Sequence, residues 1–180
     1  MKAVFIALAS TTMLLIAASA TLGGLVDGSR YFPHHFALGL VTTFFTCLSH
    51  CIVFAYFMAT HKMITLAVQD ASLDTAWPID AQRYKRRAFR MVIIGVVMAL
   101  LAAFSGAWCT INPARATVHL ILAIASTLGQ IISFAKEYAI ISANARLMDQ
   151  VFDSHSRAKG VAMPGPASAK GATDEVCNVQ

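Results

Sequence analysis

The longest apolar stretch of the chain comprises residues 114–143, which read ARATVHLILAIASTLGQIISFAKEYAIISA. A helix needs about 20 apolar residues to cross the hydrocarbon core of a bilayer, and this stretch exceeds that length. Three further stretches meet the requirement, at residues 4–25, 36–60 and 88–108. The sequence therefore predicts an all-α integral membrane protein, a bundle of four transmembrane helices arranged as two helical hairpins.

The composition supports this class of protein. The 180 residues are 57% hydrophobic and 13% charged, with a mean hydropathy of +0.64, whereas soluble domains are roughly 45–50% apolar and 25% charged. We expect one transmembrane domain over residues 1–153, with helix two continuing to about residue 71 and helix four to about residue 147. Trp77-Pro78 is expected to break the chain between helices two and three. Residues 154–180 are rich in Ala, Gly, Ser and Pro, which predicts a disordered cytoplasmic tail.

Basic residues are concentrated on one side of the predicted bundle. They are Lys62, Arg83, Lys85, Arg86, Arg87 and Arg90 in the segment from His61 to Arg90, and Arg146, Arg157, Lys159 and Lys170 after Asn144. The other connections carry one base each, Arg30 and Arg115. Because excess Lys and Arg mark cytoplasmic loops, we expect a multi-pass protein of the inner or plasma membrane with both termini in the cytoplasm. The basic loop would then face anionic lipid headgroups, and the net charge of +5 does not indicate a nucleic-acid partner.

The first predicted helix has a second interpretation. Lys2, the apolar run and Ala18-Ser19-Ala20 resemble a signal peptide with its cleavage site. The apolar run continues beyond that point to Leu25, however, and is long enough to span a bilayer. We therefore expect the helix to be retained.

A single line of polar side chains follows the fourth helix. It comprises His119, Ser126, Gln130, Ser133, Glu137 and Asn144, which share one face at about 100° per residue. The flanking residues, such as Leu120 and Ile131, are apolar. Unsatisfied polar groups are costly in hydrocarbon, so this face should contact protein or water. Its role is either hydrogen bonding between helices or, since intramembrane ionisable residues usually mark a pathway or ligand site, function at Glu137.

A weaker line on helix two comprises Thr43, His50 and His61, with Cys47 at its edge. Counting inward from the outer ends of the two helices puts His50 at the depth of Gln130, and His61 near Glu137 and Asn144. The two polar faces are therefore expected to oppose each other. Helix three instead carries small residues every fourth position, Gly95, Ala99, Ala103 and Ala107, which indicates close helix packing.

Histidines near the outer ends of helices two and four are the candidate cofactor ligands. Each follows a proline, Pro33 with His35 and Pro113 with His119, which is either a trace of a duplication with parallel halves or a coincidence. Axial haem ligation needs histidines on two helices at similar depth, and His35 with His119 roughly satisfies this. Haem b or a quinone is thus a possible cofactor. Cys47, His50 and Cys51 could approach a metal, but cysteines are ordinary small residues in helices, and no metal site is predicted.

Three classes of function remain open. The first is a small subunit or anchor of a larger membrane complex, which the size of the chain, the close-packing residues and the lack of a catalytic motif favour. The second is a haem- or quinone-binding redox subunit. The third is a proton or ion pathway along the His, Gln and Glu side chains, which would require oligomerisation. Whether the protein is an enzyme is left open, and partners are expected to be further copies or other membrane subunits.

Overall fold

The computed structural model describes residues 1–27 and 30–160. The elements are α1 (Lys2–Gly24), α2 (Phe32–Asp70), α3 (Ala76–Cys109), the short 3-10 helix η1 (Pro113–Arg115) and α4 (Ala116–Ala158). All four α-helices are long and apolar enough to cross a membrane. The prediction of an all-helical chain with four such helices is therefore confirmed.

Three helices are longer than the sequence predicted. α2 has 39 residues, α3 has 34 and α4 has 43. The expected break at Trp77-Pro78 was wrong, because the chain turns before α3, where Ser72 has a φ of 49°. Pro78 lies in the first turn of α3, where its missing N–H has no helical partner to lose. Residues 154–158, expected in the disordered tail, belong to α4, and the tail from residue 161 lies outside the described residues.

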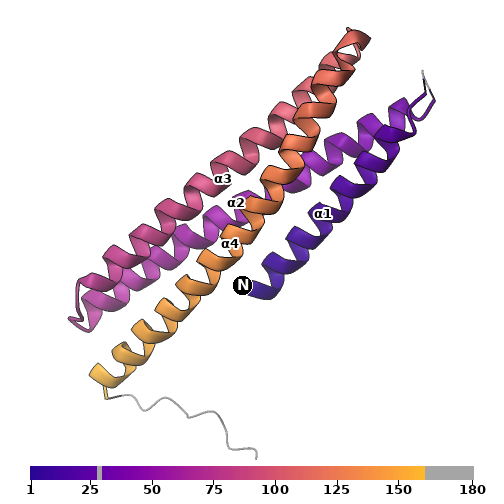
Figure 1. Cartoon of the computed structure of the whole chain (residues 1–180). Coiled ribbons are helices and arrows are strands. Elements are labelled where there is room, and N and C mark those ends of the chain that lie inside the picture. The colour runs from indigo at the N-terminus through magenta and orange to yellow at the C-terminus, as the bar shows by residue number, and fades with distance from the viewer. Residues whose placement is uncertain (28–29, 161–180) are drawn as a thin grey trace, which may run out of the picture.

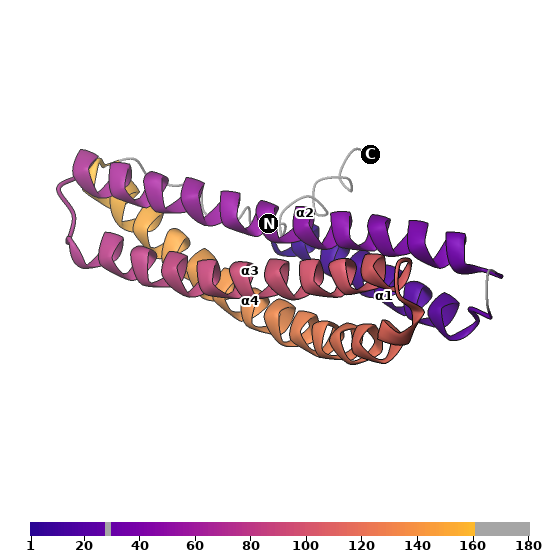
Figure 2. The ribbon, with the colours of Figure 1, turned by 90° about the horizontal axis from the view of Figure 1, so that it is seen from above.

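The helices form an elongated bundle in which α2 and α4 run in one direction and α1 and α3 in the other (Figure 1). α1 lies beside one half of α2, and the N-terminus lies near the middle of the bundle in both views (Figures 1 and 2). One apolar core, around Val53, Phe57 and Phe134, includes Phe5 of α1. A second core, around Ile64, Ala81 and Val151, is built from α2, α3 and α4 alone. The bundle thus has a four-helix half and a three-helix half.

The three-helix half carries most of the charged residues. Ionic contacts link the end of α2 to the end of α4 in this half. Asp70 of α2 contacts His155 of α4 at 2.8 Å and also contacts Lys159. The Lys159 ammonium and the His155 imidazole hold the pKa of the Asp70 carboxyl below its ordinary value. These contacts link the last turns of the two helices, although all three side chains remain partly exposed to solvent.

The burial pattern of α2 repeats in α4. Eight pairs of positions 84 residues apart are buried in both helices: Thr42 and Ser126, Thr46 and Gln130, Ser49 and Ser133, His50 and Phe134, Val53 and Glu137, Phe57 and Ile141, Thr60 and Asn144, and Ala67 and Val151. Helical periodicity alone produces part of this agreement, because any two helices with one buried face match at some shift. Identities of sequence and contact at the same shift therefore carry more weight.

Such identities exist over residues 35–59 of α2 and 119–143 of α4. The shift of 84 residues aligns six identical pairs: His35 and His119, Leu38 and Leu122, Thr43 and Thr127, Ser49 and Ser133, Ala55 and Ala139, and Ala59 and Ala143. The Thr43 hydroxyl donates to the carbonyl of Gly39, and the Thr127 hydroxyl donates to the equivalent carbonyl, that of Ala123. A shift of 83 relates Gly23 of α1 to Gly106 of α3. The two halves of the chain therefore share one pattern of packing.

Candidate functional site

The polar line of α4 is buried over most of its length. The described side chains of Ser126, Gln130, Ser133, Glu137 and Asn144 are all buried, whereas His119 is half-buried. On α2, His50 is fully buried, but Thr43 and His61 are only half-buried. The buried polar residues of α2 that the sequence interpretation missed are Thr42, Thr46, Ser49 and Thr60.

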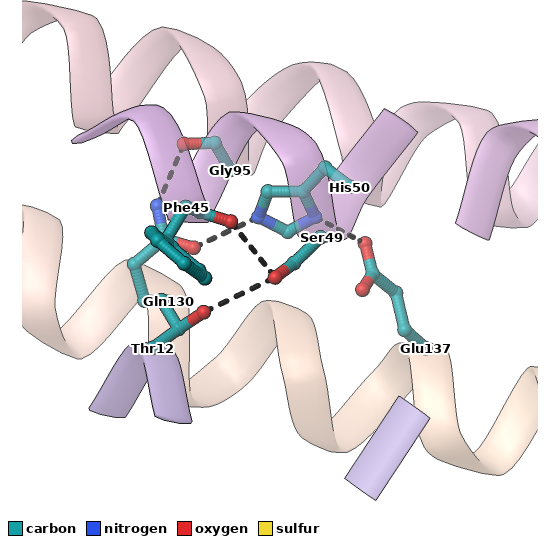
Figure 3. Close-up of polar contacts among 7 residues, drawn as sticks. All are labelled: Thr12, Phe45, Ser49, His50, Gly95, Gln130 and Glu137. Atoms are coloured by element: carbon teal, nitrogen blue, oxygen red, sulfur yellow. Dashed lines mark hydrogen bonds and ion pairs between the residues drawn. The ribbon is translucent and has the colours of Figure 1, made fainter. Parts of the chain in front are cut away.

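His50 is the centre of the buried polar network (Figure 3). Its Nδ1 lies 2.8 Å from Oε1 of Glu137, and its Nε2 lies 2.9 Å from Oε1 of Gln130. Gln130 in turn donates from Nε2 to the carbonyl of Gly95 on α3, at 2.7 Å. The ring of Phe134 stacks on the imidazole, with 5.1 Å between ring centroids. The network thus joins α2, α3 and α4 around one fully buried imidazole.

Polar contacts between helices also lie on either side of the His50 network along the bundle. Thr12 of α1 shares a hydrogen bond of 3.1 Å with Ser49 of α2, beside His50. Towards the three-helix half, Asn144 donates to Thr60 at 3.1 Å and to the hydroxyl of Tyr56 at 3.3 Å. The polar lines therefore oppose each other, as periodicity suggested, but through a different set of partners on α2.

His50 contacts Gln130, the residue expected at its depth, but the partner of Glu137 differs from the expected one. The residue that contacts Glu137 is His50 rather than His61, because the two nitrogens of one imidazole reach residues two turns apart on α4. Asn144 is paired with Thr60 and Tyr56. His61 is half-buried, and its Nδ1 is a buried atom with no hydrogen-bond partner among the described residues.

His35 and His119 form a second cluster, near the start of α2 and of α4. Their ring centroids are 6.1 Å apart and their planes are inclined at 66°. Nδ1 of His35 lies 3.0 Å from the carbonyl oxygen of Ser19 on α1. Nδ1 of His119 lies 3.0 Å from the hydroxyl of Ser105 on α3, and that hydroxyl donates to the carbonyl of Ala102. Each imidazole is therefore anchored to the helix that precedes its own.

Three glycines make room for three histidines. A Cβ atom on Gly95 would lie 2.2 Å from Nε2 of His50. A Cβ atom on Gly23 would lie 2.9 Å from Cε1 of His35, and one on Gly106 would lie 3.0 Å from Cε1 of His119. These three glycines thus allow the imidazoles to approach the backbone of a neighbouring helix closely. The spacing of small residues in the sequence did not indicate this role.

Comparison with models of protein families, with curated proteins and with solved structures gave no match to this chain. Its function must therefore be argued from the two histidine clusters.

Proposed function

We propose that this chain is a haem-binding redox subunit of a membrane complex, with His35 and His119 as the axial ligands of a b-type haem. The observation that carries the proposal is that two neighbouring imidazoles, one from each half of the chain, are both held by hydrogen bonds at Nδ1. A shared metal explains why the two rings are adjacent and have the same tautomer, whereas a purely structural anchor explains only their hydrogen bonds to the neighbouring helices.

The hydrogen bonds at Nδ1 fix the tautomer of both rings. A carbonyl oxygen can only accept, so Nδ1 of His35 must carry the proton that it shares with Ser19. The Ser105 hydroxyl has given its one proton to the carbonyl of Ala102, so it too accepts, from Nδ1 of His119. In each neutral ring the lone pair is then on Nε2, the atom free to bind a metal. Metal-binding histidines commonly donate their other N–H to a carbonyl or similar acceptor, which orients the ring.

The spacing of the rings also suits one shared metal. Two bonds from imidazole nitrogen to metal of about 2 Å each put the two nitrogens about 4 Å apart. With both Nε2 atoms turned towards that metal, the ring centres would lie a further ring radius away on each side, close to the 6.1 Å between the two ring centroids. The inclination of 66° is compatible with this, because rotation about a metal–nitrogen bond leaves the bond unchanged. Two imidazoles are the axial set of a six-coordinate haem, whereas zinc takes three or four protein ligands.

When bound, the haem would supply a one-electron redox centre, whose potential depends on its ligands, hydrogen bonds and burial. The chain's own part is to hold the two imidazoles in their metal-binding tautomer. Ser19 and Ser105 do this through α1 and α3, and Gly23 and Gly106 leave space for the rings.

We place the membrane around the four-helix half, with four crossings arranged as two hairpins. α1 has 23 residues, which gives about 35 Å of helix for a hydrocarbon core of about 30 Å. Thr12, near the middle of α1, contacts Ser49 beside His50, so the His50 network would lie near the bilayer centre. The His35–His119 pair would lie near the outer surface. The basic three-helix half would project into the cytoplasm, as the distribution of Lys and Arg favours.

The test is the absorption spectrum of the full chain, purified in mild detergent from a host that makes haem. We expect a Soret band, the sharp visible bands of a reduced six-coordinate low-spin haem, and one haem per chain. His35→Ala and His119→Ala should each lose most of the haem, because each removes one axial ligand. His34→Ala is the matched control, since that side chain is exposed and adjacent to His35, and it should keep the haem.

Titration with added reagents completes the test. Haem-free protein should bind haemin in a one-to-one ratio and develop the same spectrum. A wild-type protein that binds Zn²⁺ or Cu²⁺ at these histidines but not haemin would contradict the proposal. So would an unchanged haem spectrum in the His35→Ala, His119→Ala double variant.

A further inference from the structure

We propose that the His50–Glu137 pair is a proton-binding site that holds one proton between Nδ1 and Oε1 and thereby joins α2 to α4. This inference does not depend on the haem proposal, because it concerns a different level of the bundle and different residues. It follows from the hydrogen-bonding capacity of the groups around His50.

The Gln130 amide determines the state of one nitrogen of His50. Its NH₂ group donates to the carbonyl of Gly95, which can only accept. The amide oxygen is therefore the atom that faces His50, and it too can only accept. Nε2 of His50 must then carry a proton. In a neutral imidazole that proton leaves a lone pair on Nδ1.

A hydrogen must therefore lie between Nδ1 of His50 and Oε1 of Glu137. If His50 were neutral and Glu137 ionised, a lone pair on Nδ1 would face a carboxylate oxygen at 2.8 Å, with no hydrogen between them. Two arrangements remove this repulsion. Either Nδ1 is protonated and donates to the carboxylate, or the carboxylic acid donates to Nδ1. Both contain one proton more than neutral His50 with ionised Glu137.

Charge and burial lead to the same conclusion. The side chains of His50 and Glu137 are both 0% exposed. The second carboxylate oxygen of Glu137, Oε2, is buried and has no hydrogen-bond partner among the described residues. An unpaired buried charge is very costly, more so in a membrane. With one proton the pair has no net charge, whereas without it the bundle would contain an uncompensated carboxylate.

Among the described residues, no other charged group forms an ion pair or hydrogen bond with His50 or Glu137. α1 and α3 contribute Phe5, Ala88 and Val92 to the adjacent core, together with the hydroxyl of Thr12 and the backbone of Gly95. The titratable groups that pack around this core are the phenols of Tyr56 and Tyr84, and Tyr138 stacks on Phe5. The proton must therefore be supplied from solvent, and its release would leave one negative charge on the pair and break the hydrogen bond between Nδ1 of His50 and Oε1 of Glu137.

Spectroscopy can locate the proton, because the chain contains two glutamates, Glu137 and Glu175. Glu175→Gln leaves Glu137 as the only one, so ¹³C-labelled glutamate in this variant reports on Glu137 alone in the infrared spectrum. ¹⁵N NMR of labelled histidine, with His50→Gln to assign the signal, reports whether both nitrogens of His50 are protonated. At pH 7 we expect one of two results and not both: a protonated Glu137 carboxyl, or a His50 imidazolium.

Glu137→Gln is the second variant. It retains the shape and can donate an amide hydrogen to Nδ1, so the fold should persist while the stored proton is lost and His50 becomes neutral. Asp149→Asn, an exposed change on the same helix, should leave the His50 signal unaltered. Ionised Glu137 together with neutral His50 at pH 7 would overturn the inference. A His50 that remains an imidazolium in Glu137→Gln would overturn it as well.

Discussion

Gly95→Ala should disrupt the His50 network by direct collision. The added Cβ atom would lie 2.2 Å from Nε2 and 2.5 Å from Cε1 of His50, distances at which the imidazole must move. Overpacking of a core typically costs about 1–3 kcal/mol. Displacement of the ring also weakens two buried hydrogen bonds, at about 0.5–1.5 kcal/mol each. Alanine is the better helix former by about 1 kcal/mol, which offsets part of the loss. The net decrease in the free energy of unfolding is therefore about 1–5 kcal/mol.

Gly129→Ala provides the matched control for this change. Gly129 is a helical glycine next to Gln130, but the three atoms nearest its added Cβ atom would belong to the Met98 side chain, at 3.6 Å or more, which is ordinary contact. That variant should therefore be as stable as wild type or slightly more stable. The measurement is thermal or denaturant unfolding of both variants in one detergent, followed by circular dichroism. Equal stability of the two variants would show that the close approach of His50 to α3 is wrong.

Two further predictions concern the ends of the bundle. Asp70→Asn should destabilise the last turns of α2 and α4 at neutral pH. Because Lys159 and His155 lower the pKa of the Asp70 carboxyl in the folded chain, its contribution is present above the carboxyl's unfolded pKa of about 3.9 and is lost as the pH falls through the lower folded value. Wild type and Asp70→Asn should thus differ in unfolding midpoint at pH 7 and converge in strong acid, and a constant difference would contradict the ion-pair explanation. Reporter fusions after Ser72 and after Lys159 should indicate the cytoplasm, and one after Asn112 should indicate the outside; a fusion after Ser72 on the outer side would refute this topology. Mass spectrometry of the mature protein should find residues 1–20 retained, and a mature protein that starts at Thr21 would refute this expectation.

The helices themselves could be predicted because apolar runs of this length have few other interpretations. Their ends could not. Arg83, Arg86 and Arg87 suggested a loop, yet Arg is a good helix former, and Ala81 and Ala88 give the same segment a small, buried face. The last turns of α4 were missed for a related reason. Val151 and Phe152 pack on the second core, which the sequence alone does not reveal.

The site was only partly predictable. The polar line of α4 stands out because its flanking residues are apolar, and this identified Gln130, Glu137 and Asn144. On α2, Thr42 and Thr43 are adjacent, and both hydroxyls donate to carbonyls of their own helix, so composition could not indicate which one is buried. The pairing of His50 with Glu137 depends on the axial offset between two helices that are distant in sequence, and counting from their ends estimated this offset too coarsely.

The repeated packing pattern has an implication for the asymmetry of the interior. Two identical half-length chains around a two-fold axis would present every side chain twice, so the axis could hold a pair of like groups, such as two imidazoles. They could not place a single imidazole opposite a single carboxylate without also creating a second copy of that pair. In one continuous chain the equivalent positions can differ: 50 and 134 are His and Phe, and 53 and 137 are Val and Glu. A single chain can therefore place two equivalent imidazoles together, as at His35 and His119, and elsewhere in the same bundle place one imidazole opposite one carboxyl group, as at His50 and Glu137.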